Sequence, residues 1–236
     1  MKGPTSLCAL ASDWRGDVPT GGLMTEVKVD GWRALRFPGI TGKVRLWSRN
    51  GMPIEGTEHI LHRLALMERV AGEPMMFDGE FQVDGSLAAA KAWCERGWKI
   101  GGEAGTFFAF DMMPLRAWRE GGCSTPLYGR KRRLVALARA VDEDPALSWE
   151  WRPGSRGRDE ASPTAVQLVE DGWAFDAGDV LDAARRVWAD GGEGIMCKDA
   201  EAPYRRCRSA SWQKVKRDTR AVRTLRSVDP TGAQNM

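Results

Sequence analysis

Residues 26–33 read Glu-Val-Lys-Val-Asp-Gly-Trp-Arg, and this stretch decides how the rest of the chain is interpreted. Its alternation of residue types predicts a strand with Glu26, Lys28 and Asp30 on one side, followed by a turn at Asp-Gly. A lysine between two acids is commonly part of a surface ion-pair cluster. It can also be a nucleophile at the mouth of a sheet. That function requires a base or a lowered pKa, which a bound metal or a cation such as Arg33 would provide, whereas Asp30 would favour the charged form.

Other strands and helices are predicted along the whole chain. Short apolar or alternating runs predict strands over residues 24–29, 34–37, 44–47, 75–83, 106–111, 166–169, 194–198 and 211–216. Helical spacing of apolar residues predicts helices over residues 57–70, 86–96, 129–141 and 179–189, the first capped by Thr57. Residues 153–163 are rich in Gly, Ser, Pro and charge, which predicts an exposed loop. The mixture predicts an α+β fold of antiparallel sheets flanked by helices.

Two short segments after the first strands carry polar residues suited to a site. Residues 48–51 (Ser-Arg-Asn-Gly) end a strand in a turn, so Arg49 is either an ordinary turn residue or a phosphate or ribose ligand. Residues 78–80 (Asp-Gly-Glu) place two carboxylates inside an apolar strand. The Asp-Gly pair there predicts a bulge or a close approach of another backbone.

Three later segments can likewise be read either as ordinary strands or as parts of a site. Residues 107–111 (Phe-Phe-Ala-Phe-Asp) are typical of a core strand, and only the terminal Phe-Asp indicates the edge of a site. Residues 193–198 read Glu-Gly-Ile-Met-Cys-Lys, and residues 212–216 read Trp-Gln-Lys-Val-Lys. Lys214 and Lys216 share one strand face, where they either bind phosphates or keep a sheet edge from pairing.

Composition narrows the class of protein. The chain has 236 residues and a net charge of +3, and nine Lys or Arg against a single acid lie within residues 204–226. Such a run is either a solvated face or a phosphate-binding surface. Five Cys without C-x-x-C spacing argue against a disulfide framework or a zinc site and favour a reducing, cytoplasmic location. No apolar run approaches the roughly 20 residues of a membrane span, and no signal peptide is evident.

The joint order of the segments is more specific than any one of them. K-x-D-G-x-R, S-R-x-G, D-G-E, F-D, E-G-x-x-x-K and W-x-K-x-K follow one another between residues 25 and 216. This order resembles the covalent nucleotidyltransferase superfamily of ATP-dependent DNA ligases, RNA ligases and mRNA capping enzymes, and among these it is most similar to small phage and bacterial ATP-dependent DNA ligases. The resemblance implies a nucleotidyltransferase (adenylation) domain over residues 1–216 and a basic tail over residues 217–236.

The resemblance also implies the chemistry of the site. Lys28 would attack the α-phosphate of ATP, giving lysyl-AMP and pyrophosphate. Asp30 would assist at the 3′-hydroxyl during sealing. Mg²⁺ would be bound by Glu80 and Glu193.

The nucleotide contacts that the resemblance implies involve a larger set of residues: Glu26, Arg33, Arg49, Glu80, Phe110, Met196, Lys198, Lys214 and Lys216. Glu26 would lie near the adenine amino group, and Phe110 and Met196 would cover the two faces of the base. The arginines would contact ribose, phosphate or the nick ends. The lysines would lie at the α-phosphate, which agrees with the cations that phosphoryl transfer needs.

The partners that we expect depend on the residues that follow the last motif. Ligases of this family continue into an OB-fold domain, but residues 217–236 are too few for a five-stranded barrel, which needs at least ~30 strand residues. We therefore expect no C-terminal OB-fold in this chain, which is then a shortened chain, a natural single-domain ligase, or a protein completed by a separate OB-fold partner. We expect a monomer that binds nicked duplex DNA, either through a basic helix in the tail or through the face around residues 131–133.

The sequence thus predicts an ATP-dependent DNA ligase that seals nicks between a 5′-phosphate and a 3′-hydroxyl. An RNA ligase of the same superfamily is the alternative, and a capping guanylyltransferase is less favoured. A non-catalytic nucleic-acid-binding relic is the alternative from another class. The intact Lys28, Glu80 and Glu193 argue against it.

Overall fold

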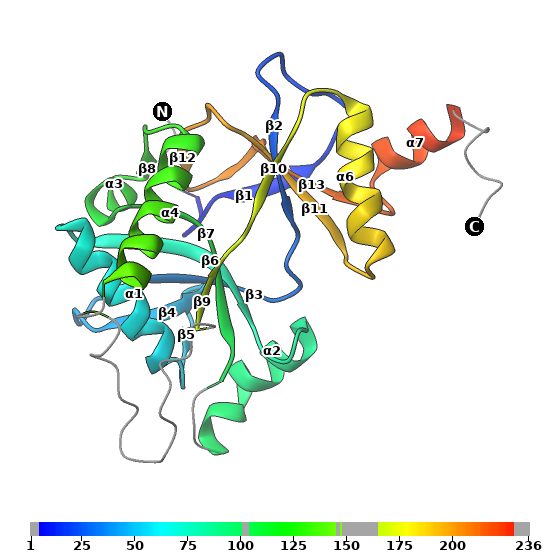
Figure 1. The fold of residues 1–236 in the computed structure, drawn as a ribbon. Coiled ribbons are helices and arrows are strands. Elements are labelled where there is room, and N and C mark those ends of the chain that lie inside the picture. The colour runs from blue at the N-terminus through cyan, green and yellow to red at the C-terminus, as the bar shows by residue number, and fades with distance from the viewer. Residues whose placement is uncertain (1–4, 101–103, 145–146, 148–164, 229–236) are drawn as a thin grey trace.

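Two mixed β-sheets with helices on their outer sides make up the computed structural model of this chain (Figure 1). It describes residues 5–100, 104–144, 147 and 165–228, so the loop predicted over residues 153–163 lies outside the described part. The strands of that part form open sheets and no closed barrel. No helix in it is long and apolar enough to cross a membrane. The sheets and the helices that flank them confirm the predicted α+β class.

The larger sheet is built around two long, almost fully buried strands, β6 and β7. Its strands lie in the order β5 (Pro53–Ile54), β4 (Val44–Ser48), β3 (Trp32–Pro38), β6 (Met75–Gln82), β7 (Thr106–Pro114) and β9 (Val166–Leu168). One face is covered by α1 (Glu58–Ala71), α2 (Leu87–Glu95) and α4 (Leu127–Glu143). Apolar runs such as that of β7 are what a strand covered on both faces requires.

The second sheet has five strands and its own helical cover. They lie in the order β1 (Leu10–Asp13), β13 (Arg208–Lys216), β11 (Gly194–Asp199), β2 (Leu23–Val27) and β10 (Asp171–Ala174). The helices that pack on it are α6 (Ala177–Ala189) and α7 (Arg220–Val228). Val222 of α7 is fully buried in a core that also contains Trp14 and Val215, so α7 is part of the packed structure.

A further core joins the two sheets. It combines Leu35 and Phe37 of β3 and Phe110 of β7 with Trp212 of β13, all of them buried. The short elements of the fold are η1 (Gly97–Ile100), α3 (Leu115–Arg119), β8 (Gly122–Cys123) and β12 (Tyr204–Arg205), the last two forming a separate pair. Because this core holds the sheets together, polar residues at its edge come from strands that are far apart in the sequence.

The predicted strands and helices of the described part are all present, with ends within three residues of the prediction. The sequence predicted antiparallel sheets, and this is wrong at one edge of each sheet. There β1 pairs with β13, and β9 pairs with β7, in parallel. Long connections precede these pairs, so no hairpin fixes their direction. The sequence did not predict β1, β5, β8, β10, β12 or α3, which have two to five residues each. Such short runs carry little periodicity of their own.

Two local predictions concern a bulge at the Asp-Gly pair of residues 78–79 and the start of α1. The bulge is confirmed, because the β6–β7 register shifts between Asp78 and Gly79. A Cβ at Gly79 would lie 2.6 Å from the Phe108 carbonyl oxygen, so the close approach is present as well. Thr57 is the N-cap residue of α1 as predicted, but its hydroxyl donates to the carbonyl of Ile54 at 3.2 Å and makes no capping bond to the helix.

Candidate active site

A cavity of about 270 Å³ opens between the two sheets. It is lined by β1, β2, β11 and β13 from one sheet and by β3, β6 and β7 from the other, together with the turn after β4. Ten residues singled out from the sequence line it: Glu26, Lys28, Arg33, Arg49, Glu80, Phe110, Met196, Lys198, Lys214 and Lys216. The lining carries seven Lys or Arg side chains against two Glu, which suits a polyanionic ligand.

Glu193 lies beside this lining and binds two of its lysines. Its Oε2 accepts a hydrogen bond from Lys28 and its Oε1 forms an ion pair with Lys216. Burial raises the pKa of Glu193, but the hydrogen bonds from Lys216 and Lys28 outweigh burial, so the pKa lies below its usual value. A carboxylate with a lowered pKa is a weak base and a firm anchor for ammonium groups.

The backbone fixes the place of this carboxylate. The Lys28 amide donates to the Gly194 carbonyl at 2.9 Å, and the Trp188 indole donates to the Glu193 carbonyl at 3.1 Å. Gly194 has a φ of 149°, and a Cβ there would lie 2.0 Å from the carbonyl oxygen of Val215. Only glycine therefore fits after Glu193, because any side chain would collide with β13.

Glu26 lies deeper in the cavity and is bound by two buried lysines. Its Oε1 accepts from Lys131 at 2.7 Å and its Oε2 from Lys198 at 2.5 Å. The Glu26 residue is 3% exposed. The face around residues 131–133 was predicted as a surface for DNA, which is wrong for Lys131 because this residue is buried. Its burial could have been inferred from its position four residues after Leu127 and three before Leu134, which places it on the apolar face of α4.

Arg33 is bound inside the site by Asp78. The Arg33 Nε donates to Oδ1 at 2.6 Å and its Nη2 to Oδ2 at 2.7 Å, while the Tyr204 hydroxyl donates to Oδ2 at 2.5 Å. Burial lowers the pKa of Arg33, but Asp78 more than compensates and raises it well above its ordinary value. Tyr204 was not expected from the sequence, since a lone tyrosine carries no motif. The predicted contact of Arg33 with the nucleotide stays a prediction.

Phe110 and Met196 lie in the lining as expected, but Phe110 is only 7% exposed. The Arg33 guanidinium lies 4.6 Å and the Lys198 ammonium 4.3 Å from the Phe110 ring centroid, and Trp212 meets the ring edge-on at 5.8 Å. The ring is thus already in contact with cations, which aromatic faces attract. Stacking of adenine on it stays a prediction.

Glu80 is the second acid of the lining and is partly buried on β6. Burial raises its pKa to about 7, against the opposing effects of Arg33 and Lys28. In the part of the chain that the structure describes, no group of three or more His, Cys, Asp or Glu could hold a metal ion. Glu80 and Glu193, the two acids predicted to bind a metal, are therefore separate carboxylates near the cavity and not part of a larger acidic cluster among the described residues.

The remaining cations differ in their environment. Arg49 is exposed on the turn after β4, where Gly51 has a φ of 81°, so the predicted Asn-Gly turn is confirmed. Lys214 forms an ion pair with Asp13 at 3.2 Å. Both side chains line the cavity and can contact phosphates there.

Asp30 is the one predicted site residue that the structure places elsewhere. β2 ends at Val27, so the expected alternation does not extend to Asp30. Its Oδ2 accepts from the amide of Leu87 at 3.3 Å, at the start of α2, and it does not line the cavity. Its role at a 3′-hydroxyl stays a prediction.

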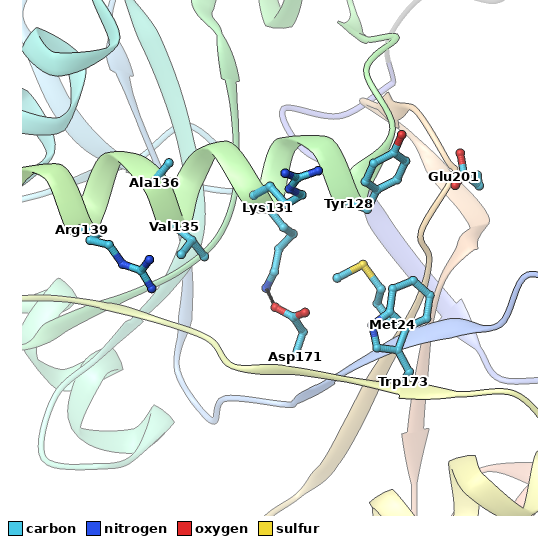
Figure 2. Close-up of a pocket in the computed structure, with 10 residues that line it drawn as sticks. Met24, Tyr128, Lys131, Val135, Ala136, Arg139, Asp171, Trp173 and Glu201 are labelled. Atoms are coloured by element: carbon cyan, nitrogen blue, oxygen red, sulfur yellow. Dashed lines mark ion pairs between the residues drawn. The ribbon is translucent and has the colours of Figure 1, made fainter.

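The larger depression near the site is a separate groove of about 660 Å³ between α4 and β10 (Figure 2). Lys131 and Asp171 line it, and their ion pair of 3.2 Å crosses it. Lys131 also binds Glu26, so this side chain links the groove to an acid of the cavity between the sheets.

Comparison with known proteins agrees with this geometry. Residues 16–216 match the family described as the ATP dependent DNA ligase domain. The chain belongs to this family of ATP-dependent ligase domains. No curated protein matches the chain.

Solved structures support the same fold. The ATP-dependent DNA ligase from bacteriophage T7 in complex with ATP is 17% identical, with a TM-score of 0.70, over 89% of this chain and 68% of that one. The ligase domain of LigD from M. tuberculosis is 25% identical, with a TM-score of 0.57, over 89% and 60%. Two Pmar-Lig structures are 22% identical with TM-scores of 0.68, and this chain spans only 46% of their length.

Proposed function

We propose that this chain is an ATP-dependent DNA ligase that works through a lysyl-AMP intermediate. AMP is transferred from ATP to Lys28, then to the 5′-phosphate of a nick, and the 3′-hydroxyl displaces it to seal the strand. The observation that carries the proposal is the position of Lys28, which shares Glu193 with Lys216 at a cation-lined cavity between the sheets.

The residues around Lys28 suit in-line attack on a phosphate. Since the pKa of Glu193 is lowered, we assign Glu193 the positioning of the Lys28 amine rather than the removal of its proton. Lys214 and Lys216 neutralise the charge on the α-phosphate, and the leaving group is pyrophosphate. Phosphoryl transfer depends mainly on such positioning and charge stabilisation.

The base and ribose of ATP occupy the inner part of the cavity in this proposal. Glu26 faces the adenine amino group, with Met196 and Phe110 against the base. Arg33 and Arg49 serve the ribose and phosphates.

Mg²⁺ is compatible with the acids present. This ion is usually held by one or two carboxylates together with substrate phosphates, so Glu80 and Glu193 suffice without a larger cluster. It would offset the repulsion between the carboxylates and the phosphates of ATP. Glu193 would then exchange one of its lysine contacts for the ion.

Nicked duplex DNA is the proposed substrate, and the protein acts as a monomer with or without a separate OB-fold partner. The basic residues of α7 and of the preceding segment contact its phosphates. Such contacts position a protein on DNA without reading sequence.

Lys28→Ala tests the proposal. The unchanged protein, incubated with α-labelled ATP and magnesium, should form a labelled band on a denaturing gel, and Lys28→Ala should form none. Lys43→Ala, at an exposed turn residue, is the matched control and should label normally. A labelled Lys28→Ala protein would show that the assignment of the nucleophile is wrong.

Sealing is tested separately with nicked DNA and nicked RNA, each with and without ATP. ATP-dependent sealing of DNA supports the proposal. Sealing of RNA alone would identify the RNA ligase instead.

A further inference from the structure

Lys131 lines the outer groove and contacts Glu26, an acid of the cavity between the sheets. It extends from α4 toward β10, where Figure 2 shows its ammonium group directed at Asp171. On its other side it reaches Glu26, which lines the cavity between the sheets. No motif includes this residue, yet it contacts the acid that lies deepest in the proposed ATP site.

The Lys131 ammonium donates two hydrogen bonds and forms one further ion pair. The hydrogen bonds go to Glu26 Oε1 at 2.7 Å and the Val169 carbonyl at 3.0 Å, and the ion pair is with Asp171 Oδ1 at 3.2 Å. An ammonium group has three donors and no acceptor, so all of its neighbours here are of the kind that it needs. The side chain is 5% exposed, and a buried charge is tolerated only when it is paired in this way.

The result is a Glu26 carboxylate with a single orientation. Lys131 holds one oxygen and Lys198 holds the other at 2.5 Å, with the side chain 2% exposed. An ionised carboxylate has only acceptor positions, and each of its oxygens has room for a second donor. A ligand group that meets Glu26 must therefore bring a hydrogen-bond donor.

We infer that Lys131 is a positioning residue that makes Glu26 select 6-amino purine nucleotides over 6-oxo purine nucleotides. The inference rests on the proposed function, because it assumes that a purine nucleotide occupies the cavity. The 6-amino group donates to the oriented carboxylate. A 6-oxo group would set one acceptor against another, and unpaired buried acceptors give strong discrimination.

Lys131 acts through Glu26 in this scheme and does not touch the nucleotide. Without Lys131, one Glu26 oxygen loses its partner, and the carboxylate can rotate toward Lys198 alone. Selectivity should then fall more than the rate of the chemical step, since Lys28, Glu193 and Lys216 are untouched. A merely structural role would instead lower stability and leave the preference between nucleotides unchanged.

The test measures formation of the covalent nucleotide adduct with ATP and with inosine triphosphate, without DNA. Lys131→Met should lower the ratio of kcat/KM values for ATP over inosine triphosphate by about ten- to a hundred-fold, the range of one hydrogen bond to a buried charged group. The loss should lie mainly in the KM for ATP. Arg139→Met, on the same helix and in the same groove, is the matched control and should keep the ratio.

Two further variants separate action through Glu26 from a general disturbance. Glu26→Gln should itself lower the ratio, and Lys131→Met added to it should change the ratio little further. Asp171→Asn weakens the third contact of Lys131 at a partly exposed position, so it should lower the ratio by a smaller factor and still fold. Lys131→Arg should restore part of the ratio because it keeps a donor and the charge.

The inference is overturned if Asp171→Asn and a folded Lys131 variant both keep the selectivity and the KM for ATP of the unchanged protein. It is also overturned if Lys131→Met has its full effect in the Glu26→Gln background. Failure of the proposed function is distinguishable, because the unchanged protein would then form no adduct with either nucleotide.

Discussion

Asp78→Asn should be among the most destabilising conservative changes in this chain. The Asp78 side chain is fully buried and accepts two hydrogen bonds from Arg33 and one from Tyr204. The change keeps the shape and removes the charge. Arg33 cannot lose its proton in response, so this arginine, whose side chain is 18% exposed, is left as a largely buried cation without its counter-charge.

The magnitude follows from this burial. Breaking a buried ion pair by removing one partner typically costs about 3–5 kcal/mol. Tyr204 can still donate to the amide oxygen of the new Asn, so its bond is retained and the estimate needs no addition for it. For a domain of this size, about 2–4 °C of melting temperature corresponds to each kcal/mol, which gives a decrease of roughly 6–20 °C.

Urea unfolding of both proteins gives the free energy of unfolding directly. The control is Asp182→Asn, because Asp182 pairs with Arg185 at 2.7 Å on the surface of α6 and both side chains are more than half exposed. An exposed pair contributes about 0–1 kcal/mol, so the control should change little.

A second variant tests the cause of the loss. Replacing both partners, as Arg33→Met with Asp78→Asn, removes the uncompensated cation, and the double variant should be more stable than Asp78→Asn alone. The reasoning is refuted if Asp78→Asn costs under about 1 kcal/mol, or if the two losses simply add.

Three further changes are predicted from the site and its surroundings. Gly194→Ala should destabilise the fold and slow adduct formation, because its Cβ would meet a carbonyl of β13 at 2.0 Å; Gly191→Ala, with open space around it, should have the smaller effect in the same assays. Burial raises the pKa of Glu80 from 4.5 to about 7 in the folded protein. Between these two pH values the carboxyl group is therefore ionised in the unfolded chain but still protonated in the folded protein. Stability should therefore decrease as pH rises through that window, and Glu80→Gln should become more stable relative to the unchanged protein by about 1–3 kcal/mol at pH 8, measured as urea unfolding against pH. Replacing the exposed Arg220 and Arg223 by Gln should weaken binding of nicked duplex and reduce the slope of log K against log salt by about 2; an unchanged slope would remove α7 from the DNA contact.

The sequence predicted well what depends on local order. Strands, helices and the bulge at Asp78 follow from residue alternation and from a glycine in an apolar run, and ten predicted residues line one cavity. The partners within the site were not predictable in this way. Lys131 lies 105 residues from Glu26, and Tyr204 lies 126 residues from Asp78. Alternation tells which face a side chain occupies, and packing of the two sheets decides what it meets there.

The end of the chain illustrates the same limit. A basic helix was expected there, and α7 is present. Its basic spacing gave no sign that Val222 is fully buried against the core around Trp14, near the other end of the chain. A protein ending after Lys216 would expose that core, so charge substitutions on α7 are the better test of DNA binding. The boundary predicted at residue 216 stays a prediction.

Burial also orders three carboxylates of the site, Asp78, Glu26 and Glu193, by how readily they can exchange partners. Asp78 and Glu26 are 0% and 2% exposed at the side chain, so water has little access to replace a contact that either carboxylate loses. Glu193 and its lysines Lys28 and Lys216 are 25–32% exposed, where water and phosphate oxygens can compete for the ammonium groups. Entry of a triphosphate should therefore break the Glu193 pairs first and leave the inner pairs in place. The inner pairs then hold the shape of the site, and the outer, exchangeable pair releases the lysine that the proposed reaction needs.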